Sequence, residues 1–144
     1  MQNNKKNICK IPKIESYPKT KVIKSFAGKG ILALEEIKKG RKIMQYIGRK
    51  ISTKEADAKP NRYIFEINSR WSLDGSPLWN VARYFNHACK PNAESVMEGT
   101  DRIFICAKKK ILPGEEITFD YGKEYVKDYI KKGGCKCRQC IAVS

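Results

Sequence analysis

The stretch RYFNHACKPN, residues 83–92, holds the only histidine of the 144-residue chain, His87, which lies between Asn86 and a lone cysteine, Cys89. Two aromatic residues precede Asn86, and Pro91 follows the cysteine. Taken alone, the stretch is typical of a buried histidine with satisfied hydrogen bonds, followed by a turn that ends at the proline. The rest of the chain decides between that interpretation and a functional one.

Three further segments accompany this stretch. AGKGI occupies residues 27–31, GEEITFDYG residues 114–122, and CKCRQC residues 135–140. A Gly-x-Gly turn or an Asp-Tyr-Gly tripeptide is common by itself, whereas all four segments in this order are distinctive. Together they resemble the SET-domain protein lysine methyltransferases that carry a post-SET zinc segment. The resemblance extends over roughly residues 20–140, which is nearly the whole chain.

The length of 144 residues suits one domain with a modest core. No apolar run approaches the length of a bilayer span, and residues 1–6 lack the apolar stretch of a signal peptide. We therefore expect a soluble, intracellular protein with no membrane contact. With the resemblance, the chain divides into a basic N-terminal arm at 1–18, a SET domain at 19–122 and a post-SET zinc segment at 123–144.

The charge of the chain is strongly positive, because 30 lysines and arginines face 15 acidic residues and give a net charge of +15. Such a charge attracts nucleic acid and disfavours the approach of a cationic peptide. Either a local acidic groove or a substrate presented on nucleic acid would reconcile this charge with a basic substrate. A third interpretation is a solvated coat, since the lysines are spread along the chain.

Short runs rich in β-branched and aromatic residues predict a mostly β fold with irregular connections. The expected strands cover residues 21–26, 31–34, 42–47, 63–68, 102–107 and 116–121. A helix is expected at 52–58, where Ser52 precedes Glu55 in a capping pattern, and another at 123–132 before a glycine pair. The resemblance implies several small sheets around a pseudoknot, in which residues 83–92 and 114–122 pass through one another.

The chain has six cysteines, which in an intracellular protein favour metal binding over disulfides. The spacing of Cys135, Cys137 and Cys140 supplies three ligands of a tetrahedral zinc site, and the fourth could be Cys9 or water. The resemblance assigns the fourth position to Cys89. Only two residues separate Cys137 from Cys140, whereas the family usually has four at this place. Cys106, within an apolar run, is expected in the core.

The Gly28-Lys29-Gly30 turn lets the backbone approach a ligand closely, although an ordinary turn between strands would look the same. The resemblance implies that S-adenosylmethionine is held by this turn and the Asn-His pair. The expected cofactor residues are Lys29, Gly30, Arg83, Asn86 and His87. No Gly-x-Gly-x-x-Gly motif opens a helix after a strand, which disfavours a Rossmann-type methyltransferase.

Tyr121 is the residue expected to carry catalysis. A lysine ammonium must lose its proton before it can attack, and a tyrosine hydroxyl can orient the resulting amine. The resemblance implies that Tyr46 is a second channel tyrosine and that Phe119 lies beside the target nitrogen. A phenylalanine there leaves room for di- or trimethylation. Tyr63 and Phe65 either flank the substrate or belong to the core.

The resemblance as a whole implies an S-adenosylmethionine-dependent lysine methyltransferase that acts on histones or other basic, nucleic-acid-associated proteins. Its location would be the nucleus or chromatin, in its own cell or a host. One rival hypothesis is a catalytically idle SET-like module that binds chromatin or RNA. Another is a zinc-binding nucleic-acid module, which would show steeply salt-dependent DNA affinity without a cofactor requirement.

Overall fold

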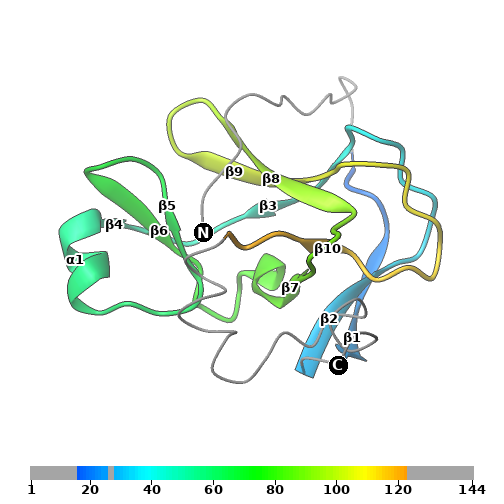
Figure 1. Cartoon of the computed structure of the whole chain (residues 1–144), viewed down its shortest axis with the longest axis horizontal. Helices are drawn as coiled ribbons and strands as arrows, with labels where there is room; N and C mark the ends of the chain where they lie inside the picture. Colours follow the sequence, from blue (N-terminus) through cyan, green and yellow to red (C-terminus); the bar gives the residue numbers. More distant parts are fainter. Residues whose placement is uncertain (1–15, 26–27, 123–144) are drawn as a thin grey trace.

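The computed structural model describes residues 16–25 and 28–122 as a mostly β fold with one α-helix and one 3-10 helix (Figure 1). This confirms the expected fold class. The expected N-terminal arm, the helix at 123–132 and the zinc segment fall largely or wholly outside these residues. In chain order the elements are β1 (Thr20–Ser25), β2 (Gly28–Ala33), β3 (Lys42–Tyr46), β4 (Arg49–Ser52), α1 (Thr53–Ala58), β5 (Ile64–Glu66), β6 (Trp71–Asp74), η1 (Val81–Tyr84), β7 (Asn86–His87), β8 (Ala93–Glu98), β9 (Arg102–Ala107) and β10 (Thr118–Phe119).

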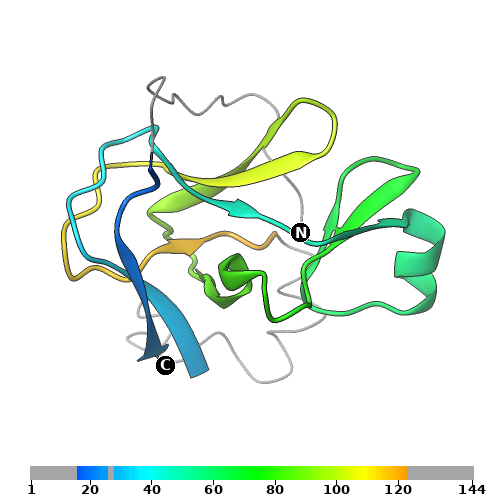
Figure 2. The same ribbon diagram turned by 180° about the vertical axis from the view of Figure 1, so that it is seen from behind.

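The strands form three small sheets. A hairpin pairs β1 with β2, a five-stranded sheet has the order β3-β9-β8-β10-β7, and a three-stranded sheet has the order β4-β6-β5. The three-stranded sheet and α1 lie at one end of the long axis, and the turns that follow β2 and β9 lie at the other (Figures 1 and 2). No helix among the described residues is both long and apolar enough to cross a membrane.

All six expected strands are present, with ends that differ by a few residues. The expected strand at 116–121 is reduced to β10, because Ile117 bonds to Ile31 of the hairpin instead, at 2.8 Å from N to O. The expected helix is α1, and the Ser52 hydroxyl accepts from the Glu55 N–H at 3.0 Å as the capping pattern predicts. Strands β4, β6, β7 and β8 were not expected, since their residues are too polar to show a strand pattern.

The last described strand, β10, lies between two strands that are close neighbours in the sequence. It pairs in parallel with β7, Phe119 opposite His87, and in parallel with β8, Phe119 opposite Ala93. Residues 88–92 therefore pass from one side of β10 to the other, and we call this segment the crossing. The crossing is the arrangement that the pseudoknot requires.

Asn92 fastens the end of the crossing to β10. Its amide donates to the Glu116 carbonyl at 2.9 Å and accepts from the Thr118 N–H at 2.9 Å, and the side chain is buried. Its own carbonyl accepts from the Lys108 N–H at 2.9 Å. Because amide hydrogen bonds are directional, this residue fixes the two segments in one register.

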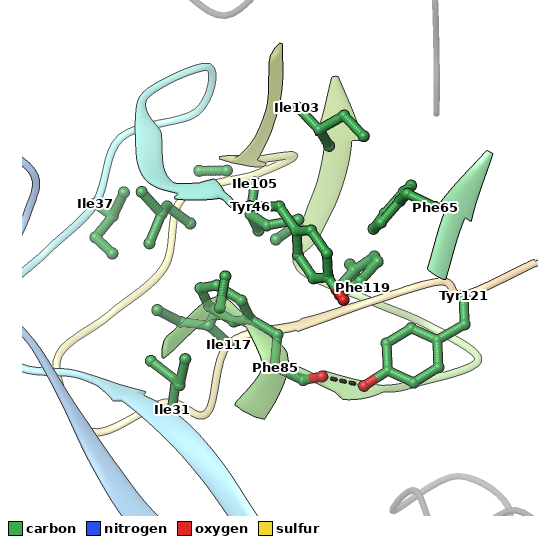
Figure 3. Packing of buried hydrophobic residues seen from close by; sticks show 14 of the residues in the cluster. Ile31, Ile37, Tyr46, Phe65, Phe85, Ile103, Ile105, Ile117, Phe119 and Tyr121 are labelled. Atoms are coloured by element: carbon green, nitrogen blue, oxygen red, sulfur yellow. Dashed lines mark hydrogen bonds between the residues drawn. The ribbon is translucent and has the colours of Figure 1, made fainter. Parts of the chain in front are cut away.

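The core lies between the five-stranded sheet and the segments that fold over it. Along β9, alternate residues point to opposite faces, so that Ile103 and Ile105 enter the main core while Phe104 and Cys106 pack with Val96 on the other face. Aromatic rings fill the part of the core nearest β10 (Figure 3). Phe65 is fully buried among them, which makes it a core residue.

Candidate active site

The three residues expected to carry catalysis meet in one place, although they come from β3, β10 and the segment after β10. The ring of Phe119 lies 4.8 Å from that of Tyr121, and Phe65 connects them to Tyr46, with ring centroids 6.2 Å and 4.7 Å apart (Figure 3). A small cavity, the aromatic hollow, opens between them. Its lining residues are Tyr46, Arg62, Tyr63, Ala82, Arg83, Phe85, Phe119 and Tyr121.

Two tyrosines of the hollow, Tyr46 and Tyr121, donate their hydroxyl protons to backbone carbonyls. The Tyr46 hydroxyl donates to the Tyr63 carbonyl at 2.7 Å, and the Tyr121 hydroxyl donates to the Phe85 carbonyl (Figure 3). A hydroxyl has one proton to give and two lone pairs. Toward any further donor, such as an amine N–H, both oxygens therefore act as acceptors.

Gly75 makes room for Tyr46. A Cβ added to Gly75 would lie 2.3 Å from the Tyr46 ring, so any other residue would displace that ring. Asn80, which is fully buried, holds the neighbouring backbones together: its amide donates to the Gly75 carbonyl at 2.9 Å and accepts from the Ile47 N–H at 3.2 Å. Neither residue stands out in the sequence, because their roles depend on contacts with β3 and the residue after it.

Arg83 lies against two aromatic faces. Its guanidinium carbon is 4.2 Å from the Tyr63 ring centroid and 5.6 Å from that of Tyr84, and the Lys29 amine lies 5.1 Å from the Tyr84 ring centroid. Cation–π contacts of this kind hold a cation in place. The Arg83 Nε is buried and has no hydrogen-bond partner among the described residues, which leaves a donor available to a ligand.

The Asn86 side chain brings together the start of β2 and the segment before β10. Its amide nitrogen donates to the Lys29 carbonyl at 2.9 Å and to Glu116 Oε2 at 3.1 Å, while Ser25 donates to the other oxygen of Glu116. A Cβ added to Gly30 would lie 3.0 Å from both Asn86 and Glu116. Gly30 is therefore required for close packing, and Glu116 is a site residue to which the sequence alone gave no role.

His87 is bonded to the segment that follows β10. Its Nδ1 accepts from the Tyr121 N–H at 3.1 Å, which places the imidazole proton on Nε2, and its ring centroid lies 5.4 Å from that of Tyr121. Burial lowers the pKa of His87, and the charge of Asp120, 3.7 Å from Nδ1, opposes that shift in part. A neutral imidazole can hold this position as an acceptor.

Cys89 is exposed at the start of the crossing, and its sulfur lies 3.9 Å from His87 Nε2. The other expected zinc ligands, Cys135, Cys137 and Cys140, lie outside the described residues. Within the described ranges, no three histidine, cysteine or acidic side chains form a group that could hold a metal ion. Cys89 thus lies at the surface, at a place that a metal ion could reach.

Comparisons with known proteins agree with this geometry. A family model described as "SET domain" matches residues 28–122. The chain is 38% identical to histone-lysine N-methyltransferase ASHH1 of Arabidopsis thaliana over 152 aligned positions, covering 94% of this chain and 30% of the relative. It is 33% identical to histone-lysine N-methyltransferase Set2 of Drosophila melanogaster, covering 76% of this chain and 5% of the relative.

A solved structure, KRYPTONITE in complex with mCHH DNA, H3(1-15) peptide and SAH, matches with a TM-score of 0.61 and 32% identity, covering 72% of this chain and 23% of that chain. The chain thus spans less than a third of each of these relatives. The family model, in contrast, takes in β2 through Gly122, including the crossing and the aromatic hollow. The matched residues include both the crossing beside β10 and the aromatic hollow, and the chain belongs to the SET-domain family.

Proposed function

We propose that this protein is an S-adenosylmethionine-dependent protein lysine N-methyltransferase whose substrate is a histone or another basic, nucleic-acid-associated protein. The observation that carries the proposal is the aromatic hollow, in which the hydroxyls of Tyr46 and Tyr121 lie beside Phe119. The names of the curated relatives support the reaction class, and the H3 peptide and SAH in the solved relative support the substrate and cofactor.

The hollow suits a lysine side chain for two reasons. Its lining is largely aromatic, and burial of an ammonium with an ordinary pKa of about 10.4 favours the neutral amine. The oxygens of Tyr46 and Tyr121 then accept the N–H groups of that amine and direct its lone pair along one line. Positioning and removal of water are the contributions that this chain makes to the reaction.

S-adenosylmethionine, when bound, supplies an electrophilic methyl group on a sulfonium sulfur. Lys29, Gly30, Arg83, Asn86 and His87 are the residues that we propose to hold it. The Nε of Arg83, which is buried and has no hydrogen-bond partner in residues 16–25 and 28–122, fits an acceptor on such a ligand. Space is left at the first residue of β2 as well, since a Cβ added to Gly28, whose φ is +98°, would meet nothing within 4 Å.

We propose a zinc ion bound by Cys89, Cys135, Cys137 and Cys140, in a post-SET segment at 123–144 that follows the SET domain. The exposed thiol of Cys89 suits such a role, because it lies at the surface end of the crossing and thiolates are preferred zinc ligands. The ion would join the crossing to the C-terminal segment and so couple metal binding to completion of the site.

A phenylalanine at position 119 sets the number of methyl groups in this proposal. Phe119 is fully buried and brings no hydroxyl to the hollow, which is the basis for proposing di- or trimethylation. The reaction on histones places the protein in the nucleus or on chromatin, of its own cell or of a host.

The experiment is incubation with labelled S-adenosylmethionine and a panel of basic proteins that includes histones. Label should appear on lysine with the wild type and be lost with Tyr121→Phe, while calorimetry shows that the variant still binds the cofactor. Label that persists in the variant would contradict the role of Tyr121. Absence of cofactor binding in the wild type would favour a catalytically idle binding module instead.

A further inference from the structure

Two lysine-rich turns that are far apart in the sequence are bound side by side at the end of the molecule opposite α1 (Figures 1 and 2). Ile37 and Ile111 exchange two backbone hydrogen bonds of 2.8 Å each. The Gly40 N–H donates to the Ala107 carbonyl at 2.8 Å, and the Ala107 N–H to the Arg41 carbonyl at 2.9 Å. These bonds fix residues 37–41 against residues 107–111.

The first turn is rigid in its own right. The Arg41 N–H donates to the Lys38 carbonyl at 3.1 Å, and Gly40 has a φ of +88° at the third position, as in a type II turn. Lys39 therefore occupies a defined corner of the turn. The lysines of both turns project from an ordered backbone, so their charges are held near one another.

The two turns concentrate positive charge without any acid of their own. Lys38, Lys39, Lys108, Lys109 and Lys110 are all exposed, and residues 37–41 and 107–111 contain no aspartate or glutamate. None of the five takes part in an ion pair within the described part of the chain, whereas the neighbouring Arg41 is paired with Glu35 at 3.5 Å. We call these five residues the lysine patch.

We propose that the lysine patch binds the phosphate backbone of duplex DNA, without reading base sequence. Lysine is a mobile point charge suited to phosphates, and base reading needs side chains with fixed donor geometry. Single strands are usually held by aromatic side chains on which bases stack. The exposed aromatic residues of the described chain, Tyr17, Trp71 and Trp79, all lie outside the two turns.

The lysine patch lies apart from the aromatic hollow, so the two can be occupied together. No residue of the lysine patch lines the aromatic hollow, so the protein can contact DNA and admit a lysine at the same time. A basic substrate bound to DNA would then be presented to a basic enzyme by the polyanion that both contact. DNA binding itself does not depend on the proposed methyl transfer, and only this consequence rests on it.

The test compares two variants that lose the same net charge. The patch variant carries Lys38→Gln, Lys39→Gln, Lys109→Gln and Lys110→Gln. The control carries Arg49→Gln, Lys54→Gln, Lys59→Gln and Arg70→Gln, which are exposed residues on and around β4 and α1. Affinity of the full chain for a 20-base-pair duplex (a length of about two helical turns) is measured by fluorescence anisotropy from about 50 to 200 mM salt, without cofactor.

The patch variant should lose about tenfold or more in affinity at the lowest salt, and the slope of log K against log salt should become shallower by about 3. The control should lose far less. Equal losses in both variants would reduce the effect to net charge and overturn the proposal, as would unchanged binding by the patch variant. Tighter binding of single-stranded RNA than of the duplex would overturn the choice of duplex DNA.

A second readout separates this inference from the proposed function. If the chain is a methyltransferase, the patch variant should methylate a free peptide at the wild-type rate and lose rate only on a DNA-bound substrate. If no protein is methylated by the wild type, the function proposal fails while the DNA-binding comparison still stands. Thermal unfolding of both variants checks that the substitutions leave the fold intact.

Discussion

The crossing and the aromatic hollow both lie beside β10, but different interactions hold each of them in place. In and beside the crossing, Asn86 and Asn92 form hydrogen bonds to backbone and side-chain groups of other segments. In the hollow, Tyr46, Phe119 and Tyr121 are placed mainly by ring packing, and the hydroxyls of Tyr46 and Tyr121 donate to backbone carbonyls. The difference indicates two roles: the crossing fixes the backbone, and the hollow holds the side chains that we propose to act on a lysine.

Metal removal should have the largest effect on activity, because the proposed ligand Cys89 belongs to the crossing. If Cys89 is a zinc ligand, a strong chelator should abolish methyl transfer, because the C-terminal segment would no longer be joined to the crossing. Activity and bound metal are measured together, before and after zinc is restored. Full activity in the chelator with no metal detected would remove zinc from the proposal.

Tyr121→Phe should come next, and it acts in the hollow. Loss of the hydroxyl should lower kcat by about 100-fold or more, because the amine loses an oriented acceptor. The free energy of unfolding should fall by only about 1 kcal/mol, since one hydrogen bond to the Phe85 carbonyl is lost. Tyr17→Phe, at a half-exposed position, is the matched control and should leave both quantities unchanged.

Asn92→Ala should lower stability more than activity, which is the opposite of the effect expected for Tyr121→Phe. It leaves the Thr118 N–H and the Glu116 carbonyl without their partner, at a cost of about 1–3 kcal/mol for each group. Urea unfolding should show this loss, while molecules that remain folded keep most of their activity. Asn68→Ala is the control: it also removes two hydrogen bonds, from the Arg70 and Trp71 N–H groups, but at an exposed turn where water can replace them, so it should cost less. Equal stability of the two variants would argue against the crossing as the part that holds the backbone.

Gly75→Ala should affect the hollow from behind Tyr46, because the new methyl group would collide with the Tyr46 ring. Overpacking of this kind costs about 1–3 kcal/mol, and displacement of Tyr46 should also lower kcat. Gly99→Ala is the comparison: its φ of +65° makes alanine unfavourable, but the added Cβ meets nothing closer than 3.8 Å, so it should lower stability and leave kcat unchanged. A Gly75→Ala protein with normal kcat would show that the position of Tyr46 is unimportant.

Phe119→Tyr should have the smallest energetic effect and the most specific one. A hydroxyl added beside the target nitrogen occupies the space of a further methyl group, so products should shift toward monomethyl-lysine. Mass spectrometry of the methylated peptide measures the distribution. Phe104→Tyr, on the opposite face of the sheet, should leave the distribution as it is. An unchanged distribution with Phe119→Tyr would contradict the assigned role.

Several features could be predicted from the sequence because they depend on residues close together in it. The cap at Ser52 needs only Glu55, and the mostly β character follows from short runs of β-branched residues. The crossing could be expected only from the resemblance, since no local pattern indicates that β10 enters between β7 and β8. The zinc ligands and the roles of the site residues stay predictions.

The features that sequence reasoning missed depend on contacts between distant residues. Gly75 looks like an ordinary loop glycine until Tyr46 is placed against it, and Asn80 acts on Ile47, which lies 33 positions earlier. In the sequence, the lysines of residues 37–41 and 107–111 form two short runs that lie far apart. The fold gathers them because Ile37 and Ile111 pair.

The position of β10 also sets an order of events during synthesis. Every strand up to β9 leaves the ribosome before residues 118–122, yet the hollow needs Phe119 and Tyr121 from that last stretch. A growing chain must hold β7 and β8 apart, or separate them again, to admit β10. Such late, long-range closure is slow compared with local folding. Until it occurs the aromatic hollow lacks Phe119 and Tyr121, so the proposed lysine site can form only after β10 is in place.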